Sequence, residues 1–194
     1  MYKTSKSNVL LFFFLTSICC PILSESVKFP EGKDCVAWKT KKRLMLVSNL
    51  EPVGLNCKIK IETVSEGSKV RVKVAVPVSG FDSGDSTRDE HVLEILKSSE
   101  HPNILFVSEP QDPKEWKTGE PKELNGKLSV AGKETPITLS IEKKKDSSWA
   151  KGQLVSKFTT FGVEPPSVAG GVIAKVEDYL ELHFQAQVPS ISTK

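Results

Sequence analysis

The sequence lacks the short motifs that mark the common catalytic classes. It contains no GxSxG, GxxxxGKS/T, HExxH or CxxC pattern, so the usual signatures of hydrolases, phosphate-binding loops and zinc sites are missing. Its three histidines, His91, His101 and His183, do not have a metal-ligand spacing such as HxxxH. We interpret His101 as a loop residue and His183 as a solvated residue on a strand. We predict no metal site, no cofactor and no enzymatic activity.

The sequence also lacks a large excess of positive or negative residues. The 194 residues include 27 Lys and Arg against 24 Asp and Glu, a formal net charge of +3. Binding to nucleic-acid phosphates requires a concentrated basic surface, so we exclude nucleic acid as a partner. The basic runs Lys39–Arg43 and Lys143–Lys145 are interpreted as solvated strand ends or turns. Attraction to anionic lipid head groups is the alternative for these runs.

An apolar run stands close to the N-terminus. Lys3 and Lys6 precede the segment Val9–Leu15 (VLLFFFL), and the small residue Ser24 follows it. This order of positive charge, apolar run and small residue is typical of a secretory signal peptide. The run is short for a membrane span, which needs about 20 apolar residues. We therefore predict a signal peptide over residues 1–24.

Cysteine is scarce after the predicted signal. The domain expected over residues 25–194 keeps only Cys35 and Cys57. Two cysteines in an oxidising compartment can close a disulfide, so we predict this bond in a periplasmic protein. The alternative is a lipoprotein attached to the membrane through Cys19 or Cys20.

Most of the remaining sequence alternates between apolar and polar residues. Valines at every second position from Val70 to Val78, and a similar alternation from Cys57 to Thr63, indicate two half-buried strands. Gly67-Ser68 separates them and predicts a hairpin. The other expected strands are Val36–Val47, Ile104–Glu109, Glu123–Val130, Ile137–Glu142, Leu154–Thr160 and Tyr179–Val188.

One segment, Asp85–Ser98, has helical spacing instead. Asp85 or Ser86 can cap its start, and His101-Pro102 ends it. One short helix with seven or eight strands predicts an antiparallel barrel or a sandwich. An eight-stranded barrel has room for side chains or one small ligand.

The densest polar run, residues 83–91, lies between the valine strand and the helix. Arg88, Asp89 and His91 have the donors and acceptors to hold the polar end of a ligand. The alternative is a structural corner in which Asp89 holds Arg88 and His91 binds a backbone carbonyl. The residue types leave both interpretations open.

Four segments in order share a pattern with known proteins. They are FDSGDSTRDEHVLEIL (Phe81–Leu96), HPNILFVSE (His101–Glu109), LNGKLSVAGKETPITLSI (Leu124–Ile141) and FTTFGVEPPSVAGGVIAKVEDYLELHF (Phe158–Phe184). In this order they resemble the YceI-like family. The resemblance covers about Lys69–Val188, whereas residues 25–57 depart from the family pattern. It implies an extended, lipocalin-like antiparallel β-barrel of about eight strands that holds a long apolar molecule, usually in the periplasm, with no agreed catalytic activity.

The residues and the resemblance together predict an exported, non-catalytic binding protein. Its expected ligand is a polyisoprenoid, quinone or fatty-acid-like amphiphile in the barrel interior. The alternatives are a surface-exposed interaction protein and an enzyme acting on an isoprenoid or amide through Asp89 or His91. Membrane contact for ligand exchange and a homodimer stay open. The predicted ligand-binding residues are Arg88, Asp89 and His91 at the mouth and Val72, Val74, Ile104, Phe106, Phe158, Leu182 and Phe184 inside. The other residues expected to face inward are Val70, Leu128, Val130, Ile137, Leu139 and Leu180.

Overall fold

The computed structural model describes residues 27–44, 48–115, 119–143, 148–168 and 174–188. The predicted signal peptide, with Cys19 and Cys20, lies outside these residues. The described chain is mostly β-structure with one α-helix. No helix in these ranges is long and apolar enough to cross a membrane.

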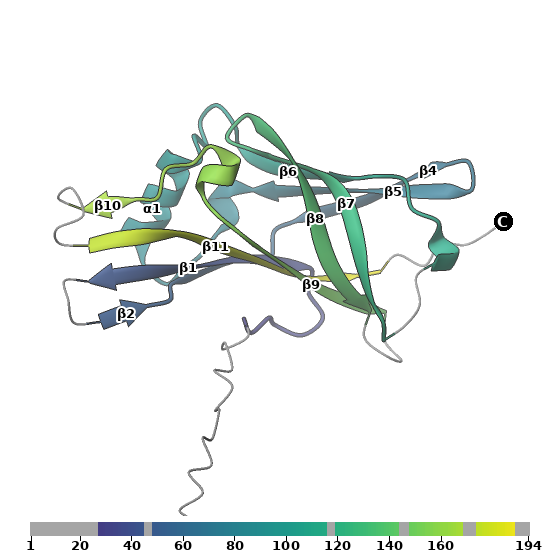
Figure 1. The fold of residues 1–194 in the computed structure, drawn as a ribbon, viewed down its shortest axis with the longest axis horizontal. Helices are drawn as coiled ribbons and strands as arrows, with labels where there is room; N and C mark the ends of the chain where they lie inside the picture. The colour runs from purple at the N-terminus through teal and green to yellow at the C-terminus, as the bar shows by residue number, and fades with distance from the viewer. Residues whose placement is uncertain (1–26, 45–47, 116–118, 144–147, 169–173, 189–194) are drawn as a thin grey trace, which may run out of the picture.

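Eleven strands of the described chain form one antiparallel sheet (Figure 1). The hydrogen-bonded order is β2-β1-β11-β9-β8-β7-β6-β5-β4, with β10 on β11 and β3 on β1. The strands are β1 (Cys35–Leu44), β2 (Ser48–Leu50), β3 (Val53–Asn56), β4 (Lys60–Glu66), β5 (Lys69–Pro77), β6 (Asn103–Ser108), β7 (Pro121–Val130), β8 (Lys133–Lys143), β9 (Trp149–Ser156), β10 (Ser167–Val168) and β11 (Ala174–Gln187).

The expectation of about eight strands was too low. The eight strands expected from alternation are all present with shifted ends, and the predicted hairpin joins β4 to β5. The three additional strands β2, β3 and β10 have two to four residues each, too few to show an alternation. The strand expected over Leu154–Thr160 begins earlier, at Trp149, and ends at Ser156. Its expected end is instead a 3-10 turn, η3 (Thr159–Phe161).

One short stretch of chain links β1 with the far end of the strand path. β3 pairs with β1, whereas β4, which begins four residues after β3 ends, pairs with β5. No ladder between β4 and β1 or β2 is present among the described residues. Leu55 of β3 exchanges two backbone hydrogen bonds with Asp82, at 2.8 and 2.9 Å. Asn56, which is 1% exposed, donates from Nδ2 to the Pro77 carbonyl at 2.8 Å. One continuous segment thus contacts both ends of the sheet.

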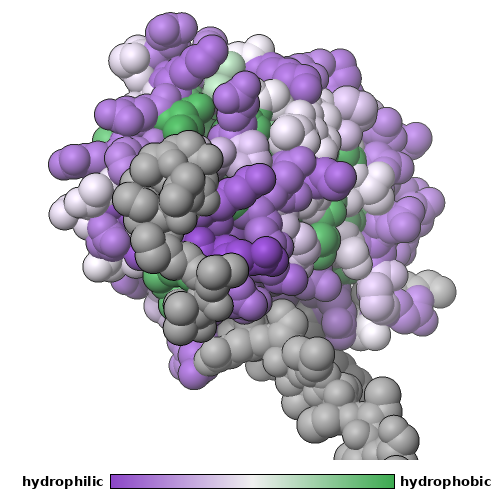
Figure 2. Space-filling view, turned by 60° about the vertical axis from the view of Figure 1, so that its left-hand side comes forward, coloured by the Kyte–Doolittle hydropathy of each residue, from purple (hydrophilic) through white to green (hydrophobic). Residues whose placement is uncertain are grey.

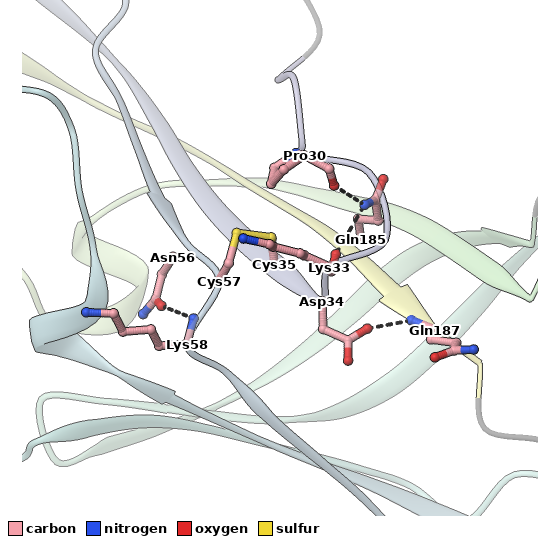
Figure 3. Close-up of a disulfide and its surroundings, with 9 residues drawn as sticks. All are labelled: Pro30, Lys33, Asp34, Cys35, Asn56, Cys57, Lys58, Gln185 and Gln187. Atoms are coloured by element: carbon pink, nitrogen blue, oxygen red, sulfur yellow. Dashed lines mark hydrogen bonds between the residues drawn. A yellow bond between two sulfur atoms is a disulfide. The ribbon is translucent and has the colours of Figure 1, made fainter.

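The predicted disulfide between Cys35 and Cys57 is present beside this junction (Figure 3). The Cα atoms of the two cysteines are 4.1 Å apart. Gln185 of β11 donates to the carbonyls of Pro30 and Lys33 nearby, so the segment before β1 is tied to the sheet. Disulfides persist in oxidising compartments, and this one indicates an extracytoplasmic protein.

The helix α1 (Ser86–Ile95) and the inner face of the sheet enclose the core. Asp85 caps α1 by accepting from the Arg88 N–H at 3.1 Å, as the sequence predicts. Val92 is the buried residue of α1, so the helix contributes little packed surface. The buried core cluster comes instead from the strands and from the segment around η3: Phe106, Leu124, Leu128, Val130, Ile141, Ala150, Phe161, Val163 and Leu180.

Candidate ligand cavity

The interior of the fold is not fully packed. A cavity of about 1030 Å³ lies between the inner face of the sheet and α1. Ligand-binding cavities commonly measure about 300–1,000 Å³, so the space is sufficient for a long ligand. All the residues that the sequence predicts to face inward line it: Val70, Val72, Val74, Ile104, Phe106, Leu128, Val130, Ile137, Leu139, Phe158, Leu180, Leu182 and Phe184.

The apolar candidate ligand-binding residues come from four parts of the chain, and Arg88, Asp89 and His91 come from α1. Val72 and Val74 lie on β5, Ile104 and Phe106 on β6, and Leu182 and Phe184 on β11. Phe158 stands at the start of η3. Nine of the ten candidates, all except Asp89, line the cavity. Contact with a ligand remains a prediction for each of them.

Three glycines provide the room for large aromatic side chains in the wall. Each glycine lies on the strand beside its aromatic residue, and both point inward. A Cβ at any of these glycines would lie within 2.6 Å of the ring, so the aromatic side chain rests against bare backbone. Each ring occupies the space next to the strand that a side chain in place of the glycine would fill. The pairs are Trp38 with Gly54, Phe106 with Gly126 and Phe184 with Gly152.

A polar corner stands at the start of α1. Asp85, Arg88 and His91 all line the cavity. The Arg88 guanidinium donates to Asp85 Oδ2 at 3.1 Å and to the Ser83 carbonyl at 3.3 Å. The Arg88 backbone N–H, together with its guanidinium, holds the pKa of Asp85 below its ordinary value. Arg88 is therefore fixed and keeps further donors for a ligand.

Asp89 differs from its prediction as a ligand-binding residue. It does not line the cavity. Its Oδ1 accepts from the Ser83 backbone N–H at 3.1 Å and from the Ser83 hydroxyl at 2.6 Å. Nor does it hold Arg88, because adjacent residues point in different directions around a helix, whereas Asp85 at i−3 shares a side with Arg88. Asp89 instead anchors the loop that leads into α1.

His91 also differs from the structural alternative. The His91 imidazole makes no hydrogen bond among the described residues, so the predicted bond from this ring to a backbone carbonyl is not formed there. Its ring remains at the cavity wall and can donate or accept. Within the described ranges, no group of three or more His, Cys, Asp and Glu side chains could hold a metal ion.

The outer face of β1 and β11 carries a buried polar cluster that sequence reasoning missed. Glu181 accepts from the Tyr179 hydroxyl and bonds His183 Nε2 at 2.8 Å. Lys39, opposite Glu181 on β1, is 3% exposed and pairs with Glu51 at 2.6 Å. The predictions that Lys39 and His183 are exposed to solvent were therefore wrong. The spacing Tyr-x-Glu-x-His, which places three polar groups on one strand face, was the available signal.

The cluster shifts the pKa values of its members. Burial alone would raise the pKa of Glu181, but the hydrogen bonds from Tyr179 and His183 and the nearby Lys39 hold it below its ordinary value. The bond to Glu181 raises the pKa of Tyr179 to about 12. The carboxylate is thus kept charged inside the cluster.

The surface at the α1 end of the molecule is mainly hydrophilic. Figure 2 shows this side with hydrophobic residues visible only in narrow gaps between polar ones. On this side of the molecule, polar residues therefore cover most of the apolar surface.

Comparison with known proteins identifies relatives in sequence and in fold. The sequence matches the YceI-like domain family over residues 45–188. Among curated proteins, none matches the chain. Three solved structures are similar in fold. BcnA of Burkholderia cenocepacia is 19% identical, with a TM-score of 0.56 over 79% of this chain and 96% of that chain. A polyisoprenoid binding domain from Saccharophagus degradans implicated in plant cell wall breakdown is 11% identical, with a TM-score of 0.57 over 79% and 94%. The YCEI protein of Campylobacter jejuni is 14% identical, with a TM-score of 0.51 over 94% and 97%.

Proposed function

Because the chain belongs to the YceI-like domain family, we propose that it is an exported, non-catalytic protein that holds one long apolar ligand in its interior. The ligand is a polyisoprenoid, a quinone or a fatty-acid-like amphiphile. The single observation that carries this proposal is the cavity of about 1030 Å³ whose wall is built from the apolar faces of the strands. The polyisoprenoid binding domain from Saccharophagus degradans, which shares the fold, supports the same ligand class.

The sheet acts as a lipocalin-like barrel in this proposal. The segment from Val53 to Glu66 supports closure, because its first half pairs with β1 and its second half with β5. The disulfide and the Asn56–Pro77 hydrogen bond hold the point where the segment passes from one edge to the other. A closed sheet would keep ligand and solvent apart along the whole length of the strands.

Apolar burial supplies enough free energy for this binding. A chain that buries about 500 Å² gains roughly 12 kcal/mol at about 25 cal/mol per Å². Association and ordering then remove a large part of that gain. The remaining free energy is sufficient for micromolar or tighter binding with few polar contacts. Such a wall selects length and width more than head group, so we expect several related ligands to bind.

The polar end of the ligand is assigned to the corner formed by Arg88 and His91. Arg88 is held by Asp85 and Ser83, so it donates from a fixed position. His91 stands at the cavity wall one helical turn further on. This arrangement suits an oxygen-rich end group such as a carboxylate, phosphate or quinone.

Export through a signal peptide over residues 1–24 places the mature domain, residues 25–194, in the periplasm. The disulfide between Cys35 and Cys57 supports an oxidising compartment. N-terminal sequencing of the protein from its own cells tests this assignment. A start near Glu25 is expected. A lipid-modified Cys19 or Cys20 would place it on a membrane surface, and an intact Met1 would overturn export.

Native mass spectrometry of the purified protein tests the function directly. We expect a mass excess from a bound small molecule, which solvent extraction should release as a long-chain isoprenoid or acyl compound. Delipidated protein should regain that mass when incubated with the extract. A protein that carries no apolar ligand and takes up none after delipidation would contradict the proposal.

A further inference from the structure

Trp38 carries an indole nitrogen with no partner. Among the buried side-chain nitrogen and oxygen atoms of the described residues, Trp38 Nε1 is the one that lacks a hydrogen bond. Buried polar groups are nearly always hydrogen-bonded, because an unpaired donor loses its bond to water and gains nothing in exchange. An indole N–H only donates. The partner that Trp38 Nε1 lacks is therefore a hydrogen-bond acceptor.

The position of Trp38 directs the search for that acceptor to the cavity. Trp38 lies on β1 opposite Leu182 of β11, and both side chains line the cavity. Thr40 and Lys42 continue the lining along β1, about 7 and 13 Å further at the rise of a strand. Trp38 thus stands inside the wall, away from that end of β1.

The wall around Trp38 does not need a nitrogen for packing. The Trp38 ring rests on Gly54, where an added Cβ would lie 2.4 Å from Nε1. Phe106 and Phe184 rest on glycines of neighbouring strands in the same way, and their rings are hydrocarbon only. The same arrangement is therefore built elsewhere in the cavity without a buried donor. The indole nitrogen is the feature that distinguishes Trp38.

We infer that Trp38 determines ligand specificity by donating its indole N–H to an oxygen atom within the bound chain. This inference rests on the proposed function and narrows its ligand class. The preferred ligand is a long apolar chain with a carbonyl, ether or hydroxyl oxygen that reaches Trp38, in preference to a plain hydrocarbon. Because Nε1 is covered in the structure, this inference requires the indole to turn about its side-chain torsions when the ligand enters.

Two probes of equal chain length test this inference, heptadecan-9-one and heptadecane, delivered from cyclodextrin and measured by calorimetry. The wild-type protein should bind the ketone about tenfold more tightly than the hydrocarbon, as expected for one additional hydrogen bond in an apolar site. Trp38→Phe keeps an aromatic ring on Gly54 and removes the donor. It should abolish the preference for the ketone, so that the two probes bind with similar affinity.

Phe184→Leu is the matched control, because it alters the wall without removing a donor. It should weaken both probes to a similar degree. Equal losses for both probes in Trp38→Phe would show that Trp38 only packs, and the inference would be wrong while the proposed function stands. A wild-type protein that binds neither probe would instead contradict the proposed function itself.

A second readout measures the wild-type protein directly. In wild-type protein with ¹⁵N-labelled indoles, the Trp38 N–H signal should move downfield with heptadecan-9-one and stay in place with heptadecane. The three tryptophans of the chain give few signals, and Trp38→Phe or selective mutation of the other two assigns them. No shift with a bound ketone would overturn the inference.

Discussion

The two faces of β11 differ in what they bury. Leu180, Leu182 and Phe184 point inward and line a cavity, so their apolar surface is only partly matched by other side chains. Glu181 and His183 alternate with them on the outer face, where they are hydrogen-bonded within a buried polar cluster; His183 also borders the cavity. Successive residues of one strand therefore serve different purposes. The inner face borders the cavity, and the outer face carries the buried polar cluster.

The largest effect should come from placing a charge on the inner face. Leu182→Arg puts a guanidinium into the apolar cavity and is expected to weaken binding of a prenyl or acyl chain at least a hundredfold, because it fills space and buries an unpaired charge. Phe106→Arg should do the same on β6. Calorimetry with a long-chain alcohol measures the loss, and circular dichroism checks the fold.

Leu105→Arg provides the control for that experiment. Leu105 is the neighbour of Phe106 on the outer face and is 45% exposed. Its arginine would remain in water, so binding should be unchanged. If Leu105→Arg and Phe106→Arg weakened binding equally, the assignment of the ligand to the inner face would be wrong.

The next effect concerns the disulfide at the start of β1, where Cys35 lies opposite Gln185 of β11. Cys35→Ser with Cys57→Ser removes a crosslink that closes a loop of 22 residues. The free energy of unfolding should fall by about 3 kcal/mol on the chain-entropy account. Urea titration of the oxidised protein and the double variant measures the difference. Unchanged stability would show that the junction does not depend on the disulfide.

A smaller effect is expected at the polar corner. Arg88→Ala and His91→Ala should each weaken binding of an amphiphile by about 1–3 kcal/mol, because each leaves a polar group of the ligand unpaired. Lys127→Ala removes an exposed surface charge that pairs with Glu134 and should have no effect. Variants that unfold, in a protein that binds no apolar ligand, would favour the structural interpretation of this corner.

The smallest effect should come from the outer cluster. The pKa of Glu181 in the folded protein lies below its ordinary value of 4.5, so its charged form stabilises the fold above that pH. The stabilisation is lost as the pH falls through the folded pKa. Glu181→Gln should therefore lower stability at pH 7 by about 1 kcal/mol and reduce the acid dependence between about pH 5 and 3. Equal acid dependence in both proteins would contradict this role, and ligand affinity at pH 7 should not change.

Local patterns were sufficient to predict most strands and the helix. The valines of β5 alternate over nine residues, and the cap at Asp85 follows from its own helix; both depend on neighbours close in sequence. The short strands β2, β3 and β10 could not be predicted in this way, because they exist through pairing with β1 and β11. The hydrogen bonds of Asp89 could not be predicted for a similar reason. Its partner Ser83 lies in a loop whose path is set by the bridge between Leu55 and Asp82.

The sequence by itself determined which residues face inward, because a strand alternates its side chains with a period of two. The resemblance of four segments in order likewise identified the YceI-like family. Only the tertiary structure decided that the interior stays open and that Trp38 keeps an unpaired donor in its wall. Open space depends on how large rings rest on glycines of neighbouring strands, as Phe184 rests on Gly152. The buried state of Lys39 and Glu181 was decided in the same way, since each depends on the opposite strand and on residues distant in sequence.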